Sequence, residues 1–229
     1  MPAFVAFDDV LTAAALAELR GSIHGSRLIG ESQLVGAFEA TRGFGLACRV
    51  SAIEEGIAKV PWLRGFIALA LDDERRARLL EPSLFDRVGA AVFGDVNAVY
   101  VNVLVVPGGG AVATHVDSTL GVVEGDDVVY TPRAVAVLYV DVPADLQGGQ
   151  LRLWNGDTQV GEVTPRENRF VLFRGALGHE VTTTTSTTPR VSCVCELYAL
   201  PRARLAQLPR VRLQSRGFQD VLARLRRPR

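Results

Sequence analysis

Two histidines and one aspartate stand where they could bind a metal ion together. His115 and Asp117 are two residues apart in ATHVDST, and His179 follows 64 residues later in RGALGHEV. On an extended strand, residues i and i+2 point to the same face, so His115 and Asp117 could occupy two adjacent positions on one metal. Two His and one carboxylate on one side of an iron leave open positions, a pattern typical of non-haem Fe(II) oxygenases. These three residues are our candidate metal ligands and catalytic residues.

The same residue types are compatible with other kinds of protein. An HxD pattern arises often by chance, and a lone His is often a satisfied core residue. A non-catalytic binding module whose histidines are incidental is therefore one alternative. A zinc-dependent hydrolase with the same three ligands is another, because zinc binds His and carboxylate and can activate water. Such a hydrolase would need no anchor for a dicarboxylate.

Arg190 is the residue that bears on this choice. It lies 11 residues after His179, and the turn-like TSTTPR before it would bring the chain to the start of the next strand. A guanidinium near the metal could bind the far carboxylate of a dicarboxylate cosubstrate through two hydrogen bonds. Ser192 shares the Arg190 face and could add a hydroxyl. The alternative is an ordinary surface charge, because Arg is the default cation of this chain.

The second half of the chain must supply the strands that position these residues. From residue 96 onward, short β-branched segments alternate with turn residues, and no helical segment separates them. This pattern argues against a parallel βαβ sheet. We predict an α+β fold in which a double-stranded β-helix, a jelly roll of antiparallel sheets, packs against N-terminal helices. The strand candidates are VNAVYVNVLVV, RAVAVLYVDV, GQLRLWN, RFVLFRG, HEVTTTT and RVSCVCELYAL.

We expect one structural domain with three regions: a mainly helical support (1–95), the jelly-roll core (96–200) and an Arg-rich extension (201–229). In the first region, Asp8 or Asp9 would cap a helix through VLTAAALAELRGSI, and a Ser cap would begin a helix in SAIEEGIAKV. WLRGFIALALDDERRARLL and SLFDRVGAAVFG are further helix candidates, and the Gly-rich segment 25–50 could be a hairpin.

Composition says little about partners. Hydrophobic residues make up 48% and charged residues 22%, and the formal net charge is zero, as is ordinary for a soluble globular protein. The extension carries nine Arg and one acid. A basic tail can bind nucleic acid, but no basic face interleaved with aromatics accompanies it, so a nucleic-acid partner is not expected. We expect it to fold back on the domain as a solvated, partly helical end.

The location is expected to be cytoplasmic. No apolar run reaches the ~20 residues that span a bilayer, and MPAFVAFDDV lacks a signal-peptide pattern. The three cysteines, Cys48, Cys193 and Cys195, are an odd number without a CxxC pair, which favours buried, reduced thiols. We therefore expect a small-molecule or a peptide or protein substrate and no membrane partner, while the oligomeric state is left open.

Residues 100–200 resemble the prolyl-hydroxylase branch of the Fe(II)/2-oxoglutarate-dependent dioxygenases. An ordered set of segments carries the resemblance: VVPGGG-AVATHVD, AVLYVDV, GGQLRLW, RFVLFRG-ALGHEV and PRVSCV. It implies that the HxD and the distal His bind iron, and that the basic residue about ten positions later binds the far carboxylate of 2-oxoglutarate. Those roles fall on His115, Asp117, His179 and Arg190.

The resemblance implies further contacts to 2-oxoglutarate. Tyr139 would donate its hydroxyl to the same carboxylate, and Leu151 of the GGxL segment would lie near the cosubstrate. One departure concerns Val106, because hypoxia-type prolyl hydroxylases have a Tyr just before the Pro-Gly turn. Asn102 shares the face of Val106 by strand alternation, and it is our candidate for a replacement polar contact.

The activity implied by the resemblance is hydroxylation of a C–H bond, with release of succinate and CO2. The substrate would be a peptidyl or free amino acid of prolyl type or a small metabolite. The cofactors would be Fe(II), 2-oxoglutarate as cosubstrate and O2, with ascorbate as a candidate additional requirement. The acidic segment 118–132, with Glu124, Asp126 and Asp127, is a candidate substrate lid that would select a cationic substrate, and a solvated loop is the alternative.

Overall fold

The computed structural model describes residues 2–31, 41–79, 95–121 and 129–215. Three expectations from the sequence fall outside these ranges. They are the helix in SLFDRVGAAVFG, the acidic side chains of the candidate lid, and the last part of the Arg-rich extension, residues 216–229.

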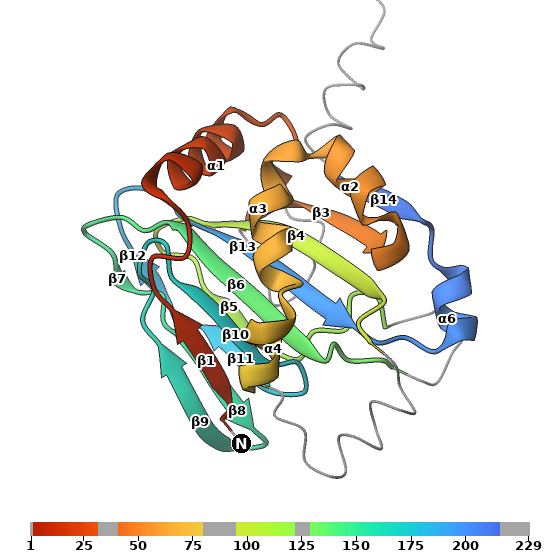
Figure 1. The fold of residues 1–229 in the computed structure, drawn as a ribbon. Coiled ribbons are helices and arrows are strands. Elements are labelled where there is room, and N and C mark those ends of the chain that lie inside the picture. The colour runs from red at the N-terminus through yellow and green to blue at the C-terminus, as the bar shows by residue number, and fades with distance from the viewer. Residues whose placement is uncertain (1, 32–40, 80–94, 122–128, 216–229) are drawn as a thin grey trace, which may run out of the picture.

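A large antiparallel sheet forms the centre of the fold (Figure 1). Its strand order is β1-β10-β6-β13-β4-β3-β14, with β2 paired to β3. The strands are β1 (Phe4–Phe7), β2 (Gly30–Glu31), β3 (Arg42–Arg49), β4 (Ala98–Val106), β6 (Ala134–Asp141), β10 (Phe170–Arg174), β13 (Arg190–Tyr198) and β14 (Val211–Gln214).

A second, smaller sheet has the order β5-β11-β8-β9, and β12 pairs with β7. Its inward side chains pack against those of the large sheet in one apolar cluster, which includes Val135 and Tyr139 from one sheet and Leu151 and Leu153 from the other. These two packed antiparallel sheets confirm the predicted jelly roll. The strands are β5 (Val112–His115), β7 (Gln147–Gly148), β8 (Leu151–Asn155), β9 (Thr158–Val163), β11 (Gly178–Val181) and β12 (Thr184–Thr185).

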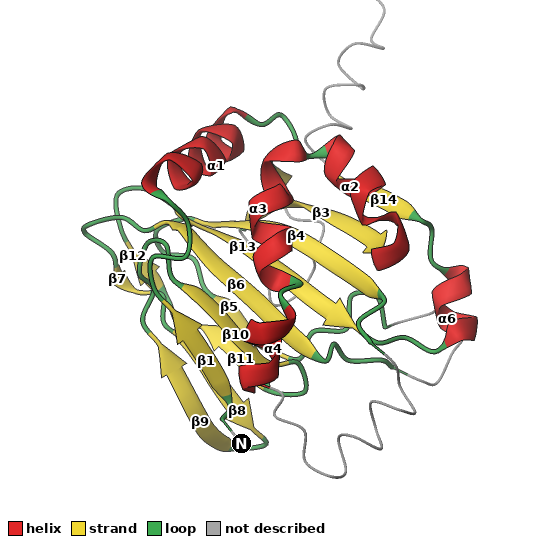
Figure 2. Ribbon diagram, viewed as in Figure 1, coloured by secondary structure: helices red, strands yellow, loops and turns green. Residues whose placement is uncertain are grey.

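Helices α1 to α4 cover the large sheet on the side away from the small one (Figure 2), whereas Leu205 of α6 packs with Tyr100 and Tyr198 on its other face. Two short 3₁₀ turns, Val50–Ala52 and Pro61–Leu63, precede α2 and α3. No described helix has both the length and the apolar character needed to cross a bilayer. The helices are α1 (Ala13–Gly25), α2 (Ile53–Lys59), α3 (Arg64–Ala70), α4 (Asp73–Leu79) and α6 (Arg202–Gln207).

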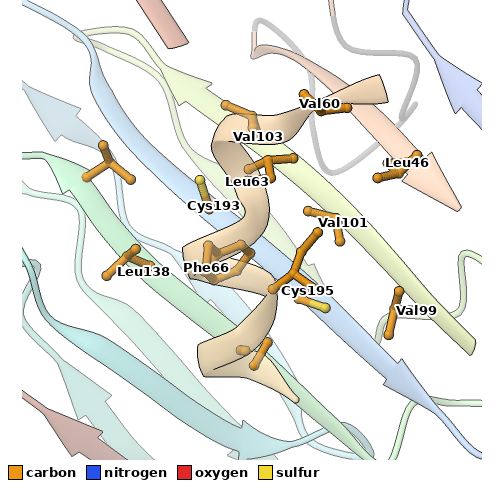
Figure 3. Packing of buried hydrophobic residues seen from close by; sticks show 14 of the residues in the cluster. Leu46, Val60, Leu63, Phe66, Val99, Val101, Val103, Leu138, Cys193 and Cys195 are labelled. Atoms are coloured by element: carbon orange, nitrogen blue, oxygen red, sulfur yellow. The ribbon is translucent and has the colours of Figure 1, made fainter. Parts of the chain in front are cut away.

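The core lies between these helices and the sheet, where alternate residues of each strand point to the helical side. Figure 3 shows Phe66 of α3 near Cys193 and Cys195 of β13, with Val101 and Val103 of β4 beside them. All five side chains are fully or almost fully buried. The cysteines of the chain are buried and unpaired, as predicted.

The N-terminal region contains more strand than expected. β1, β2 and β3 join the large sheet, so the region predicted to be mainly helical contains both helices and strands. The Gly-rich segment does contain an antiparallel pair, because Gly30 lies opposite Gly43 and Glu31 opposite Arg42. Long-range pairing decides these segments, since β1 pairs with β10, which lies more than 160 residues away along the chain.

The predicted helix caps were wrong. Thr12 caps α1, and its side chain accepts a hydrogen bond from the Ala15 amide at 3.2 Å. Asp8 instead pairs with Arg169, at 2.7 Å between Oδ1 and Nε. Ser51 lies inside the 3₁₀ turn before α2, and α2 has no side-chain cap.

The helix predicted through WLRGFIALALDDERRARLL is broken into α3 and α4. The break lies at Asp72, whose carboxylate accepts a hydrogen bond from the Arg75 amide at 2.8 Å. A side chain that binds an amide three residues further on favours the start of a new helix over continuation of the old one.

The described part of the Arg-rich extension folds back on the domain, as expected. After α6, β14 pairs with β3 at the edge of the large sheet. Arg49 of β3 donates a hydrogen bond from Nε to the Leu208 carbonyl at 3.0 Å. Arg204 donates to the Leu120 carbonyl at 2.8 Å, so α6 also holds the turn that follows Asp117.

Substitution of Phe66 tests the packing of α3 on the large sheet. The Phe66 side chain is fully buried and meets the Phe170 ring edge-on at 6.5 Å. We expect Phe66→Ala to lower the free energy of unfolding by about 3–5 kcal/mol, because the lost burial is accompanied by a cavity. Urea denaturation measures this change. Val160→Ala on the exposed side of β9 is the control and should cost less than about 1 kcal/mol. Equal costs for the two variants would contradict this description of the core.

Candidate metal centre

Pairing of β5 with β11 brings the two predicted histidines together. His115 and His179 lie directly opposite each other in the register of the two strands. Their ring centroids are 4.2 Å apart. β5 ends at His115, so Asp117 lies beyond the strand rather than on it. The ligand atoms of the three residues nevertheless lie within 4.8 Å of one another, and no other such group of His, Cys, Asp or Glu occurs among the residues described.

Backbone carbonyls fix which nitrogen of each ring is protonated. Nδ1 of His115 is 2.8 Å from the Ala113 carbonyl oxygen, and Nδ1 of His179 is 3.3 Å from the Leu177 carbonyl oxygen. A carbonyl oxygen only accepts, so each Nδ1 must carry the proton that it donates. Nε2 of each neutral ring then presents a lone pair, which is the arrangement found for His ligands of metals.

Both Nε2 atoms face the Asp117 carboxylate. His115 Nε2 is 3.4 Å from Oδ1, and His179 Nε2 is 3.4 Å from Oδ2. Asp117 and His179 are buried, and Oδ2 accepts no hydrogen bond from the part of the chain that is described. Three electron-rich groups that converge in a buried place need a cation between them, which fits a divalent metal ion.

The pKa values of the two histidines shift in opposite directions. Burial lowers the pKa of His115, but the attraction of Asp117 and the hydrogen bond to the Ala113 carbonyl outweigh it and raise the pKa overall. Burial lowers the pKa of His179, and the attraction of Asp117 only partly offsets it. Phe173 adds an apolar wall, with its ring centroid 4.9 Å from that of His179. His179 is therefore kept neutral, as a metal ligand must be.

Arg190 is buried in the same cavity as the three candidate ligands. Its side chain is 2% exposed, and Nη1 donates a hydrogen bond to the Gly149 carbonyl at 2.9 Å. The guanidinium carbon lies 5.4 Å from the centre of the Tyr139 ring. Nε has no hydrogen-bond partner, and no carboxylate of the described residues forms an ion pair with Arg190. Burial lowers the pKa of Arg190. A buried guanidinium without a counter-charge fits a binding site for an anion.

The remaining predicted site residues also line this cavity: Tyr139, Leu151, Ser192 and Asn102. Tyr139 and Ser192 lie opposite each other on β6 and β13, and Ser192 Oγ has no hydrogen-bond partner among the residues described. Asn102 lies opposite Val194, near the middle of the neighbouring strand pair β4–β13. Val106, which stands where hypoxia-type prolyl hydroxylases have a Tyr, does not line the cavity. It packs in a small apolar cluster instead.

Several residues that line the cavity were not predicted from the sequence. Most are apolar, and one is acidic, Glu196. The signal for Glu196 was available, because it has the same parity on the strand as Arg190 and Ser192. The missed residues are Leu104, Val112, Val135, Val137, Phe173, Val181, Val194 and Glu196.

Glu196 connects the cavity to the turn that follows Asp117. Its carboxylate accepts hydrogen bonds from Thr119 Oγ1 at 2.7 Å, from the Thr119 amide at 3.3 Å and from the Tyr198 hydroxyl. The Tyr198 hydroxyl in turn accepts from the Leu120 amide at 3.3 Å. Burial, together with the nearby charge of Asp117, raises the pKa of Glu196 to about 8.

Comparison with known proteins supports this description of the site. Residues 100–197 match the model of the 2OG-Fe(II) oxygenase superfamily. Over these residues the chain is similar to that superfamily. The match spans β4 to β13, and therefore the three candidate ligands and Arg190. Membership of this superfamily implies an oxygenase that uses Fe(II), 2-oxoglutarate and O2. No curated protein sequence matches the chain.

Several solved structures share the fold at low sequence identity. The chain is similar to a prolyl hydroxylase from Trichoplax adhaerens, with 16% identity, a TM-score of 0.55 and coverage of 91% of this chain and 88% of that one. It is also similar to a Pseudomonas putida prolyl-4-hydroxylase (18% identity, TM-score 0.50, coverage 88% and 95%). A Burkholderia pseudomallei oxidoreductase of the 2OG-Fe(II) oxygenase family matches at 14% identity, a TM-score of 0.52 and coverage of 86% of both chains.

Thermal unfolding with metal tests the ligand set without any assay of activity. A ligand that binds only the folded state stabilises it by RT ln(1 + [L]/Kd), about 2.7 kcal/mol at one hundred times Kd. We therefore expect Co(II), an air-stable divalent ion, to raise the Tm of the wild-type chain by several degrees. Asp117→Asn should remove most of that increase. An unchanged increase in the variant would show that the metal binds elsewhere.

Proposed function

We propose that this chain is an Fe(II)- and 2-oxoglutarate-dependent hydroxylase that oxidises a C–H bond and releases succinate and CO2. One observation supports the proposal most directly. A single buried cavity contains a cluster that fits a divalent metal, His115, Asp117 and His179, and a buried guanidinium without a counter-charge, Arg190. An oxygenase with a dicarboxylate cosubstrate needs both features together.

His115, Asp117 and His179 would hold Fe(II), and the ion with O2 and 2-oxoglutarate would supply the oxidising chemistry for the C–H bond. Arg190 would bind the far carboxylate of 2-oxoglutarate. Tyr139 lies under the guanidinium and would add its hydroxyl. The chain's task is then to bind, orient and exclude water.

Smaller contributions complete the proposed cosubstrate site. Ser192, next to Tyr139 across the strand pair, would donate its hydroxyl to the same carboxylate. Leu151 is 3% exposed and would pack against the carbon chain of 2-oxoglutarate. Asn102 would add a polar contact from β4. Apolar walls around these groups would keep water from the bound carboxylates and strengthen each hydrogen bond.

Two other functions are less well supported. A zinc-dependent hydrolase could use the same ligands, but it would leave Arg190 buried without an anion, at a cost of several kcal/mol. A non-catalytic binding module would not explain why two histidines face a buried carboxylate. The superfamily match adds weight against both.

The nature of the substrate is part of the proposal. The Trichoplax prolyl hydroxylase is solved in complex with a peptide fragment of the hypoxia inducible factor oxygen degradation domain. For this chain we propose a peptidyl or free amino acid or a small metabolite, with ascorbate as an additional reductant and a cytoplasmic location. We also propose that residues 1–95 and 201–229 support a catalytic core at 96–200.

Succinate formation tests the proposed reaction. We expect His115→Ala to abolish both succinate formation and Fe(II) binding, because two ligands cannot hold the ion at this site. His24→Ala is the matched control, since His24 is the only other histidine of this chain and pairs with Asp141 at 3.0 Å, away from the cavity. Retained turnover in His115→Ala would overturn the proposal.

A second prediction tests the cosubstrate anchor. Arg190→Lys should raise the KM for 2-oxoglutarate about 10- to 100-fold, because an ammonium cannot reproduce the two parallel hydrogen bonds of a guanidinium. Arg152→Lys on β8 is the control, since Arg152 pairs with Glu162 and does not line the cavity. Its KM should stay within about twofold of the wild-type value. An equal rise in both variants would exclude a specific role for Arg190.

A further inference from the structure

The cavity also contains a buried carboxyl group, that of Glu196, which is negative when it is ionised. Glu196 lies on the same face of β13 as Arg190, six residues further along the strand. At about 3.3 Å per residue the two backbone positions are about 20 Å apart. Glu196 accepts hydrogen bonds from Thr119, two residues after Asp117, whereas Arg190 donates to the Gly149 carbonyl. Glu196 therefore lies on the metal-ligand side of the cavity, remote from the proposed carboxylate anchor.

Glu196 is held in one orientation by three hydrogen-bond donors. Two come from Thr119 and one from Tyr198. A carboxylate has about four acceptor positions on its two oxygens. Oε2 accepts two of these hydrogen bonds and Oε1 one, which leaves one acceptor position on Oε1. The side chain is 4% exposed and contributes to the wall of the cavity.

No basic side chain of the described residues forms an ion pair with Glu196, whereas most acids of known placement pair with an Arg on the surface. A buried carboxylate is costly without a cation or a full set of hydrogen bonds. Most side chains that line the cavity are apolar, and Arg190 is the one basic Lys or Arg among its described lining residues. A cation that enters the cavity would therefore stabilise the ionised form of Glu196.

We propose that Glu196 binds a positively charged amine of the substrate, so that the enzyme acts on free amines such as amino acids with an unblocked nitrogen. This inference rests on the proposed function, because it places the substrate beside the metal. A prolyl residue within a peptide has no N–H and no charge at its nitrogen. Such a substrate would leave the ionised carboxylate buried without a counter-charge, which a site built around a charged hydrogen bond disfavours strongly.

A purely structural role for Glu196 predicts something different. In that case the carboxylate would only hold the turn at Thr119 and, through it, Asp117. Loss of Glu196 would then reduce turnover of every substrate by the same factor. Thr119→Val would have a similar effect, since it removes one of the hydrogen bonds while leaving the carboxylate in place.

The first experiment uses the wild-type chain and pairs of compounds. Succinate formation is measured with Fe(II), 2-oxoglutarate and O2 for the free L-amino acids, each beside its N-acetyl derivative, and for N-acetylated proline-containing peptides. We expect turnover with one or more free amines and at least 100-fold lower kcat/KM for the N-acetyl partner. Equal or better turnover of the acetylated compound or the peptides would overturn the inference, and so would a lack of turnover with every free amine.

The second experiment compares variants on the best pair of compounds. Glu196→Gln keeps the size of the side chain and an oxygen that can accept from Thr119, but it removes the charge. We expect it to lower the ratio of kcat/KM for the amine to that for its N-acetyl form by about 100-fold. Thr119→Val should leave this ratio within about threefold, even where both rates fall. A ratio that is unchanged in Glu196→Gln would refute the amine contact.

Failure of this inference can be distinguished from failure of the proposed function. Under anaerobic conditions, addition of 2-oxoglutarate to the Fe(II)-loaded chain should produce a metal-to-ligand charge-transfer band. Absence of the band in the wild-type chain would refute the oxygenase itself. A normal band together with a preference for acetylated compounds would refute only the role of Glu196.

Discussion

The alternation of side chains along β13 connects the helical core to the cavity. Cys193, Cys195 and Leu197 point toward the helices, whereas Arg190 and Glu196 point toward the small sheet. A slip of one residue would exchange the two faces and bury both charges in the apolar core. Pairing with β4 and with β6 along its length holds the register, so the polar face of the cavity depends on this central strand.

The metal ligands depend on a different part of the fold. Two of them are opposite each other on β5 and β11 of the small sheet, and the third lies on the turn beyond β5. That turn is held by the large sheet, because Thr119 donates to Glu196 and Leu120 donates to Tyr198. The geometry of the three ligands therefore requires both sheets in their observed arrangement. This is a reason for the single domain that we propose.

Local pattern was enough to predict most of the site. HxD spacing, the later His and the parity of Arg190 and Ser192 are properties of short segments, and the structure brings these residues into one cavity. Glu196 has the same parity, but an acid within an apolar strand gives no local sign of what it faces. Its partners Thr119 and Tyr198 become visible only when the turn and the strand are placed together.

In the fold, too, some strands could be predicted from local sequence, whereas others depend on pairing with distant segments. The strands after residue 96 were predictable from their β-branched runs and turns. β1, β3 and β14 were not, because each becomes a strand by pairing with a partner far away in the sequence. The caps of α1 and α2 were also missed. Asp8 could have capped a helix, but it forms an ion pair with Arg169, which is distant in the sequence and close only in the folded chain.

Distance along β13 keeps the buried Arg190 guanidinium and the buried Glu196 carboxyl group apart within one cavity. In contact, at 4 Å, a guanidinium and a carboxylate attract each other by about 4 kcal/mol at an effective dielectric constant of 20. At the roughly 20 Å that six residues of strand imply, the same attraction is only about 1 kcal/mol. Arg190 and Glu196 therefore cannot neutralise each other. With Val194 between them on the same face, the proposed function gives each of them a ligand of opposite charge at its own end of the cavity.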